Sequence, residues 1–123
     1  MRQQQVRRRW RDYRTASGRS PVREFIDGVR AQNLHDAARI LAAMDEVARH
    51  GTVVARHLRG DIWEVRATSD RRIFRILFAE EGRSSQILLA LEGFAKTTRR
   101  TPPATIDLAE ERLRDWRERG RSS

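Results

Sequence analysis

The chain has 123 residues, of which 35% are charged and 38% apolar. A single domain over 1–123 is predicted, because domains most often contain roughly 100–150 residues. There is no cysteine, which excludes disulfides, thiolate zinc sites and a cysteine nucleophile. The longest apolar run, 87–91, is far shorter than the roughly 20 residues of a membrane helix, and no apolar stretch follows the charged N-terminus. A soluble cytoplasmic protein without membrane association is therefore expected.

Basic residues outnumber acidic ones by 26 to 17, which gives a net charge of +9 and a pI near 11.5. Lys96 is the only lysine, so almost the whole excess is arginine. Arginine binds phosphate through two parallel hydrogen bonds and stacks on bases. Nucleic acid is therefore the first expected partner of this small basic domain. The alternative is a solvated basic surface, or one that meets an acidic protein.

The first half of the chain predicts a short edge strand over 6–13, a loop over 15–19 and two amphipathic helices. Ser20 and Pro21 are typical of a helix start, and a stop is expected at 32–33. The second helix has Asp36 as its expected cap and Gly51 as its C-terminal cap. Two consecutive helices with a short joint predict a helical hairpin that packs against a sheet.

From residue 62 the apolar period changes to two, which predicts strands over 62–68, 71–79 and 85–94. Their short connections predict antiparallel pairing. In the middle strand Phe74, Ile76 and Phe78 share one face, which can receive the hairpin. Thr101-Pro102-Pro103 is expected to open a C-terminal helix. The expected fold is α+β in the order β-α-α-β-β-β-α, with frayed basic ends at 7–9 and 119–123.

Arginines lie on successive strands of this predicted meander, in the segments 63–66, 72–78 and 94–102. An antiparallel arrangement brings Arg66 and Arg75 toward the 96–100 segment, and such cations repel one another unless an anion compensates them. A polyanion would do so, which argues for a phosphate site. The alternative is that Glu64 and Glu92 pair the arginines across strands as ordinary surface ion pairs.

Three motifs in this order resemble those of a known group of proteins. They are Trp63-Glu64-Val65-Arg66, then Arg75-Ile76-Leu77-Phe78 after an aromatic residue, then Phe94-x-Lys96-x-x-x-Arg100-Thr101-Pro102. Together they make nearly the whole chain similar to the RelE/ParE toxin superfamily, and within it to the phage-derived HigB-like branch. The resemblance implies the toxin of a type II toxin–antitoxin module.

Toxins of this kind generally cut mRNA in the ribosomal A site without metal or cofactor, by in-line attack of a ribose 2′-hydroxyl on its own phosphate. That chemistry needs a base, cations around the developing charge and a proton donor for the leaving oxygen. By motif position, Arg66 and Arg75 would hold phosphate, and Lys96 would be a second cation or the base. Glu64 would be the base or an orienting partner for arginine.

The resemblance also implies residues that contact nucleic acid. Arg72, Arg99 and Arg100 would bind the RNA backbone, and Phe78 would stack on a base. Phe78 stands where many relatives have a tyrosine and Thr97 where many have a lysine, so no phenolic role is available at 78.

The implied partners are the ribosome with its mRNA and a cognate antitoxin, expected to carry a helix-turn-helix domain. Two alternatives stay open: a non-enzymatic ParE-like toxin that poisons DNA gyrase by protein contact, and a degenerate toxin that only binds. His35, His50 and His57 lack the close spacing of metal ligands, so no metal is expected.

Overall fold

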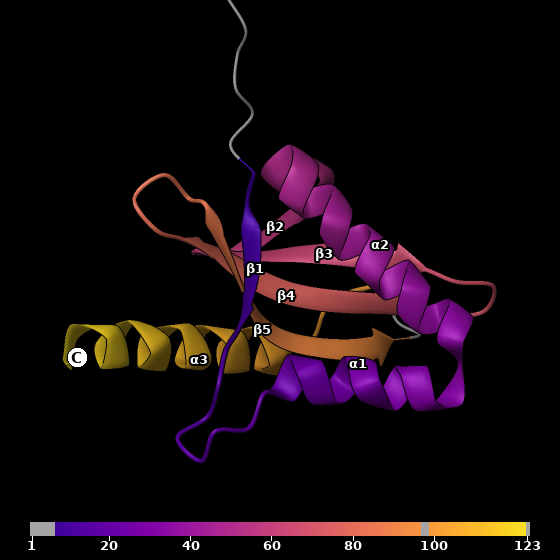
Figure 1. Ribbon diagram of the computed structural model, residues 1–123, viewed down its shortest axis with the longest axis horizontal. Helices are drawn as coiled ribbons and strands as arrows, with labels where there is room; N and C mark the ends of the chain where they lie inside the picture. The colour runs from indigo at the N-terminus through magenta and orange to yellow at the C-terminus, as the bar shows by residue number, and fades with distance from the viewer. Residues whose placement is uncertain (1–6, 97–98, 123) are drawn as a thin grey trace, which may run out of the picture.

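A computed structural model describes residues 7–96 and 99–122 (Figure 1). The elements are β1 (Arg9–Asp12), α1 (Pro21–Gln32), α2 (Leu34–His50), η1 (Gly51–Val54), β2 (Arg56–Arg59), β3 (Ile62–Thr68), β4 (Ile73–Glu81), β5 (Ile87–Lys96) and α3 (Pro103–Ser122). The helices and strands follow the expected order, except that a short 3-10 helix and one strand that the sequence did not predict, β2, lie between the second helix and β3.

One five-stranded sheet joins the two halves of the chain in the order β1-β5-β4-β3-β2. The pairs β3–β4 and β4–β5 are antiparallel, as predicted. The unpredicted strand β2 is also antiparallel to β3, whereas β1 lies parallel to β5 at the edge. The sheet is therefore mixed. A parallel pair needs a long connection, and the whole α1–β4 segment supplies it here. The α+β class and the edge position of β1 are confirmed.

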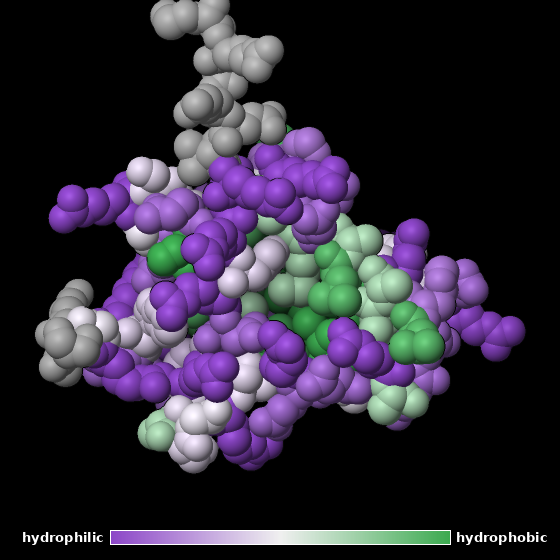
Figure 2. All heavy atoms as spheres, viewed as in Figure 1, coloured by the Kyte–Doolittle hydropathy of each residue, from purple (hydrophilic) through white to green (hydrophobic). Residues whose placement is uncertain are grey.

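The helical hairpin covers one face of the sheet, as the alternation in β4 predicts (Figure 1). Phe74, Ile76 and Phe78 are fully or almost fully buried beneath it. Gly93 lets α1 approach β5 closely, because a Cβ there would lie 2.6 Å from Cδ2 of Phe25. Figure 2 shows hydrophobic side chains at the surface between and along α1 and α2, on the side that faces the viewer. Leu41 of α2 is 44% exposed.

The opposite face is covered by α3 over only part of its length. Ala109 and Leu113 of α3 pack there on Leu77, Leu89 and Leu91. The same face continues past Leu77 to the polar residues of β3 and β4, where residues 99–101 contact Arg75. That uncovered end of the sheet holds the candidate site described below.

The helix ends differ from the expected ones in one place. Asn33 alone separates α1 from α2 in an extended conformation, and its Oδ1 accepts a hydrogen bond from the Asp36 backbone N–H at 3.0 Å. Asn33 therefore caps α2, and the expectation of Asp36 as the cap was wrong. Gly51 ends α2 with φ of 77°, a conformation that favours glycine, as predicted.

Secondary structure begins and ends close to both ends of the described chain. The Arg8 backbone N–H donates to the Ala48 carbonyl at 3.3 Å, and β1 begins at Arg9. At the other end α3 continues to Ser122, past the glycine at 120. The fraying expected at 7–9 and 119–123 stays a prediction.

Tyr13 fastens the end of β1 to α3, since its buried hydroxyl donates to Oδ2 of Asp115 at 2.6 Å. Burial first, and then this hydrogen bond, raise the pKa of the phenol above its ordinary 10.0. The folded protein thus keeps a proton that the unfolded chain loses, so this contribution to stability holds below pH 10.0 and is lost as the pH rises above it.

This is the only tyrosine, so phenolate absorbance reports it alone. A spectrophotometric titration should give a midpoint above 10.0 in the native protein and one near 10.0 in urea. Equal midpoints in the two states would contradict the arrangement.

Candidate functional site

A buried carboxylate lies at the centre of the end of the sheet that α3 does not cover. Glu64 of β3 has a side chain that is 0% exposed. Its Oε1 accepts a hydrogen bond from Nε of Arg66 at 3.0 Å, and its Oε2 accepts one from the Thr101 hydroxyl and lies 3.5 Å from Nη1 of Arg75. A buried carboxylate needs such partners, because burial without them is very costly.

Arg75 of β4 lies directly across from Arg66 of β3 in the strand register, so both arginines share one face of the sheet. The Arg75 side chain is only 2% exposed. Its Nη1 donates to Oγ1 of Thr101 at 3.1 Å, and its Nη2 donates to the Arg99 carbonyl at 3.1 Å. Arg75 therefore lies beneath the surface and joins the sheet to the chain that leaves β5.

A shallow hollow of about 220 Å³ opens above this buried pair. Its rim carries arginines from three separate elements: Arg56 of β2, Arg66 of β3 and Arg100 before α3. Arg56 reaches this face because β2 pairs it with Glu64. Arg56 and Arg100 are exposed, and the Arg66 side chain is 38% exposed. The lining residues are Arg56, Leu58, Glu64, Arg66, Arg75, Arg100 and Thr101.

Phe78 does not belong to this hollow. It is 0% exposed and packs edge-on against Trp10 under the hairpin, with ring centroids 5.2 Å apart. Residues three apart on a strand point to opposite faces, so Phe78 and Arg75 cannot share one. The interpretation of Phe78 as a residue that stacks on RNA bases was wrong, and alternation along β4 already placed it in the core.

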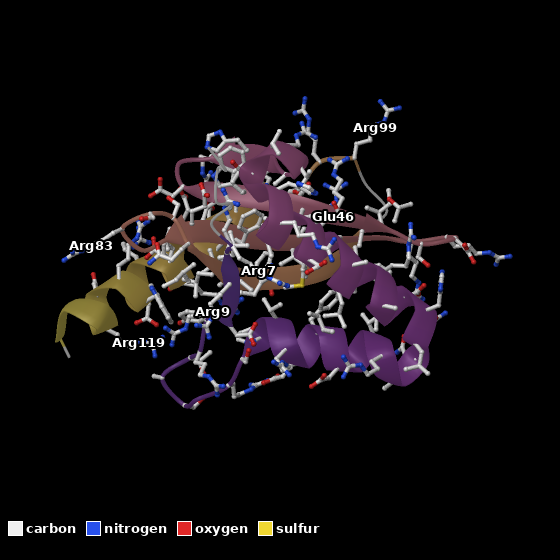
Figure 3. The ribbon with its side chains drawn as sticks, turned by 45° about the horizontal axis from the view of Figure 1, so that its top comes forward. Arg7, Arg9, Glu46, Arg83, Arg99 and Arg119 are labelled. Carbon is white, nitrogen blue, oxygen red and sulfur yellow. The ribbon has the colours of Figure 1, made fainter. Side chains whose placement is uncertain are left out.

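The other predicted residues are spread more widely. Arg72 lies in the β3–β4 turn and lines a different hollow, beside His35 and Arg71. Arg99 is exposed and its side chain extends away from the ribbon in Figure 3, while its carbonyl binds Arg75. Lys96 ends β5 opposite Ile73, and its side chain lies outside the part of the chain that the structure describes.

Glu92 differs from Glu64 in its partner. Its Oε1 lies 3.3 Å from Nη1 of Arg112 on α3, so among the contacts that the structure describes it serves α3 rather than the strand arginines. Glu64 does pair with strand arginines, but inside the protein. The alternative of ordinary surface ion pairs therefore describes neither carboxylate.

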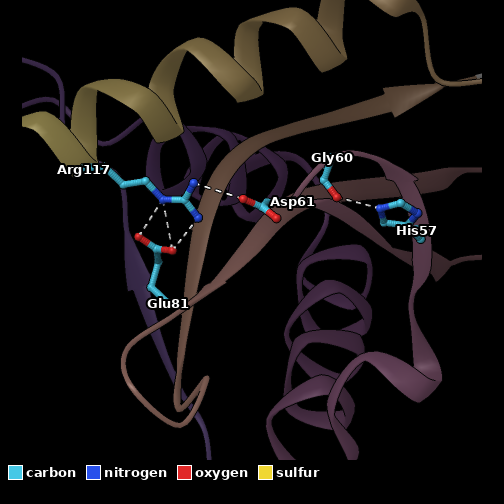
Figure 4. Close-up of polar contacts among 5 residues, drawn as sticks. All are labelled: His57, Gly60, Asp61, Glu81 and Arg117. Atoms are coloured by element: carbon cyan, nitrogen blue, oxygen red, sulfur yellow. Dashed lines mark hydrogen bonds and ion pairs between the residues drawn. The ribbon is translucent and has the colours of Figure 1, made fainter.

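Ion pairs to α3 hold β2, which carries Arg56 of the rim, and the turn that follows it. Arg117 of α3 binds Asp61 at 3.0 Å and Glu81 at 2.9 Å. His57 of β2 lies with its Nε2 2.7 Å from the carbonyl oxygen of Gly60 in the turn (Figure 4). Arg59, at the end of β2, binds Glu110 of α3 at 2.7 Å. Exposed pairs of this kind contribute little energy singly, but several together fix the position of β2 against α3.

Sequence reasoning missed two residues of the site, Arg56 and Thr101. Arg56 belongs to a four-residue strand without apolar alternation, so no period marked it. Thr101 follows Arg100 in the third motif and was interpreted only as part of a helix start.

Within the described residues, no three histidine, aspartate or glutamate side chains gather as metal ligands. No described helix is long and apolar enough to cross a membrane.

No curated protein matches the chain. Residues 23–114, most of the chain, do match the model of one family, described as phage derived protein Gp49-like (DUF891). The resemblance to RelE-type toxins is thereby confirmed at the level of this family. The chain belongs to the Gp49-like family, a RelE-like toxin family of toxin–antitoxin systems.

Proposed function

We propose that residues 1–123 form one HigB-like toxin domain that cuts mRNA on the ribosome and thereby stops translation. The observation that carries the proposal is the meeting of Arg56, Arg66 and Arg100 around one hollow. Cations from three elements at one place match an anion with several oxygens, and a ribose–phosphate backbone supplies such anions in series.

The proposed reaction needs no metal. The ribose 2′-oxygen attacks the adjacent phosphorus, its proton passes to a base, and the 5′-oxygen of the next nucleotide leaves and takes up a proton. The products are a 2′,3′-cyclic phosphate and a 5′-hydroxyl. Arg66 and Arg56 stabilise the charge that develops on the phosphate oxygens.

Glu64 fits the role of an orienting partner better than that of the base. Its carboxylate is enclosed and already accepts from Thr101 and Arg66. Arg75 adds positive charge from beneath rather than by direct contact. Lys96 stays a proposal as a second cation or as the base, and Arg99 as a contact to RNA. Arg72 stays a proposal as a backbone contact outside the hollow.

A cognate antitoxin is the partner that the family implies. We propose that it carries a helix-turn-helix domain, and that the toxin acts in the cytoplasm on ribosomes and mRNA.

The test maps the 5′ ends of a reporter mRNA in a translating extract after addition of the purified protein. New ends should arise inside the reading frame only while ribosomes translate. Because in-line attack leaves a 5′-hydroxyl, these ends should accept a ligated adapter only after treatment with a polynucleotide kinase.

Two results would contradict the proposal. Intact mRNA together with inhibited supercoiling by DNA gyrase would favour the ParE-like alternative. Ribosome binding without new ends would indicate a toxin that only binds.

A further inference from the structure

We propose that Thr101 and Glu64 are positioning residues, which hold residues 99–101 against the sheet so that Arg100 lies over the hollow. This inference rests on the proposed function, since it assigns Arg100 to RNA. Neither residue touches RNA in this role, and each acts through Arg100.

The Thr101 hydroxyl is engaged on both sides. It donates to Oε2 of Glu64 and accepts from Nη1 of Arg75 at 3.1 Å. Thr101 is 9% exposed, and both partners are more deeply buried still. The hydroxyl thus forms one hydrogen bond with a buried carboxylate and another with a buried guanidinium. An apolar group in its place would leave each of these two charges with one hydrogen bond fewer.

The residue before Arg100 is held by the same pair. The Arg99 carbonyl accepts from Nη2 of Arg75 at 3.1 Å, so one guanidinium binds the chain on either side of Arg100. Pro102 continues the anchored segment, and its carbonyl accepts from the Thr105 backbone N–H at 3.0 Å in the first turn of α3. The backbone at Arg100 is therefore fixed from both directions.

A long side chain on a fixed backbone loses less entropy when it binds than one on a loose loop. Arg100 lines the hollow together with residues of β2, β3 and β4. If the 99–101 segment came loose, the rim would lose this cation although no charge had been removed from the protein.

The loss of this cation can be tested by a measurement of RNA binding that a general loss of protein stability would not change in the same way. The affinity of a short single-stranded RNA is measured by fluorescence anisotropy at several salt concentrations. Each phosphate contact in a single strand contributes about 0.7 to the slope of log affinity against log salt. Arg100→Ala should reduce the slope by about that amount.

Thr101→Val removes no charge, yet it should reduce the slope as much as Arg100→Ala does, and it should weaken binding by a similar factor. Thr101→Ser keeps the hydroxyl and should retain the slope of the wild type. In a Thr101→Val background, Arg100→Ala should have almost no further effect. If valine does not fit at position 101, Thr101→Ala is a second variant without the hydroxyl. A thermal melt checks that each variant is folded.

Limited trypsin digestion tests the fastening without RNA. Cleavage after Arg100 should be several-fold faster in Thr101→Val than in the wild type or in Thr101→Ser, because the loosened segment enters the protease more readily. An unchanged cleavage rate would overturn the proposal that Thr101 holds the segment.

Full additivity of Thr101→Val and Arg100→Ala, or an unchanged salt slope in Thr101→Val, would overturn the positioning role. Absence of RNA binding in the wild type would instead overturn the proposed function, and the cleavage rates would still decide whether Thr101 fastens the segment.

Discussion

Glu64→Ala is expected to lower the free energy of unfolding by about 3–5 kcal/mol, which is the usual cost of removing one partner from a buried ion pair. The carboxylate is the common partner of Thr101, Arg66 and Arg75, and it is fully enclosed. Its loss leaves the Arg75 charge buried without that anion. Urea unfolding, followed by tryptophan fluorescence, measures the difference.

Two controls separate burial from charge. Arg66→Ala removes a partner of the same carboxylate whose side chain is 38% exposed, so it should cost no more than about 1 kcal/mol. The double variant Glu64→Leu/Arg75→Met replaces the buried pair with apolar side chains and should recover most of the lost stability. A Glu64→Ala protein as stable as Arg66→Ala would contradict the buried pair.

Because Arg75 is also buried, a substitution of Arg75 gives an ambiguous result. The motif placed Arg75 among residues that hold phosphate, but in the structure it binds Thr101 and the Arg99 carbonyl. An inactive Arg75→Ala protein would not distinguish lost chemistry from lost structure. Arg56 and Arg66, which are exposed, are better probes of RNA contact.

Periodicity predicted those features of the fold that depend on one segment at a time. The three- and four-residue spacing of apolar side chains gave α1 and α2, and alternation gave the faces of β4. Short connections gave the antiparallel pairing of β3, β4 and β5. These features follow from local geometry, which sequence alone determines well.

Burial in the site could not be predicted in this way, because it depends on segments far apart in the chain. The antiparallel arrangement of the strands brought Arg66 and Arg75 toward one place, and they are indeed opposite one another. It did not indicate that the chain around Thr101 covers Arg75 and leaves Arg66 open. Phe78 shows the reverse case, since family position suggested a contact residue where alternation indicated the core.

The double variant Arg56→Ala/Arg66→Ala is expected to weaken binding of a short single-stranded RNA by roughly 100-fold, since each hydrogen bond to a charged group contributes about 1.5 kcal/mol or more. The two arginines form adjacent sides of the hollow, on β2 and β3. The salt slope should fall by about 1.4, the contribution of two phosphate contacts. Growth arrest on expression should be lost together with binding.

Arg9→Ala/Arg14→Ala is the matched control, because it removes the same charge from a different hollow beside β1, and neither arginine is assigned to RNA. A general electrostatic attraction between a basic protein and RNA would weaken equally in the two double variants. If RNA binds at a defined site at the Glu64 end of the sheet, the affinity falls only in Arg56→Ala/Arg66→Ala. Equal losses of affinity in both double variants would show that the excess of arginine, rather than the arrangement around Glu64, binds the RNA. Arg56 makes this comparison decisive, since it belongs to the site only through the pairing of β2 with β3 and through no sequence motif.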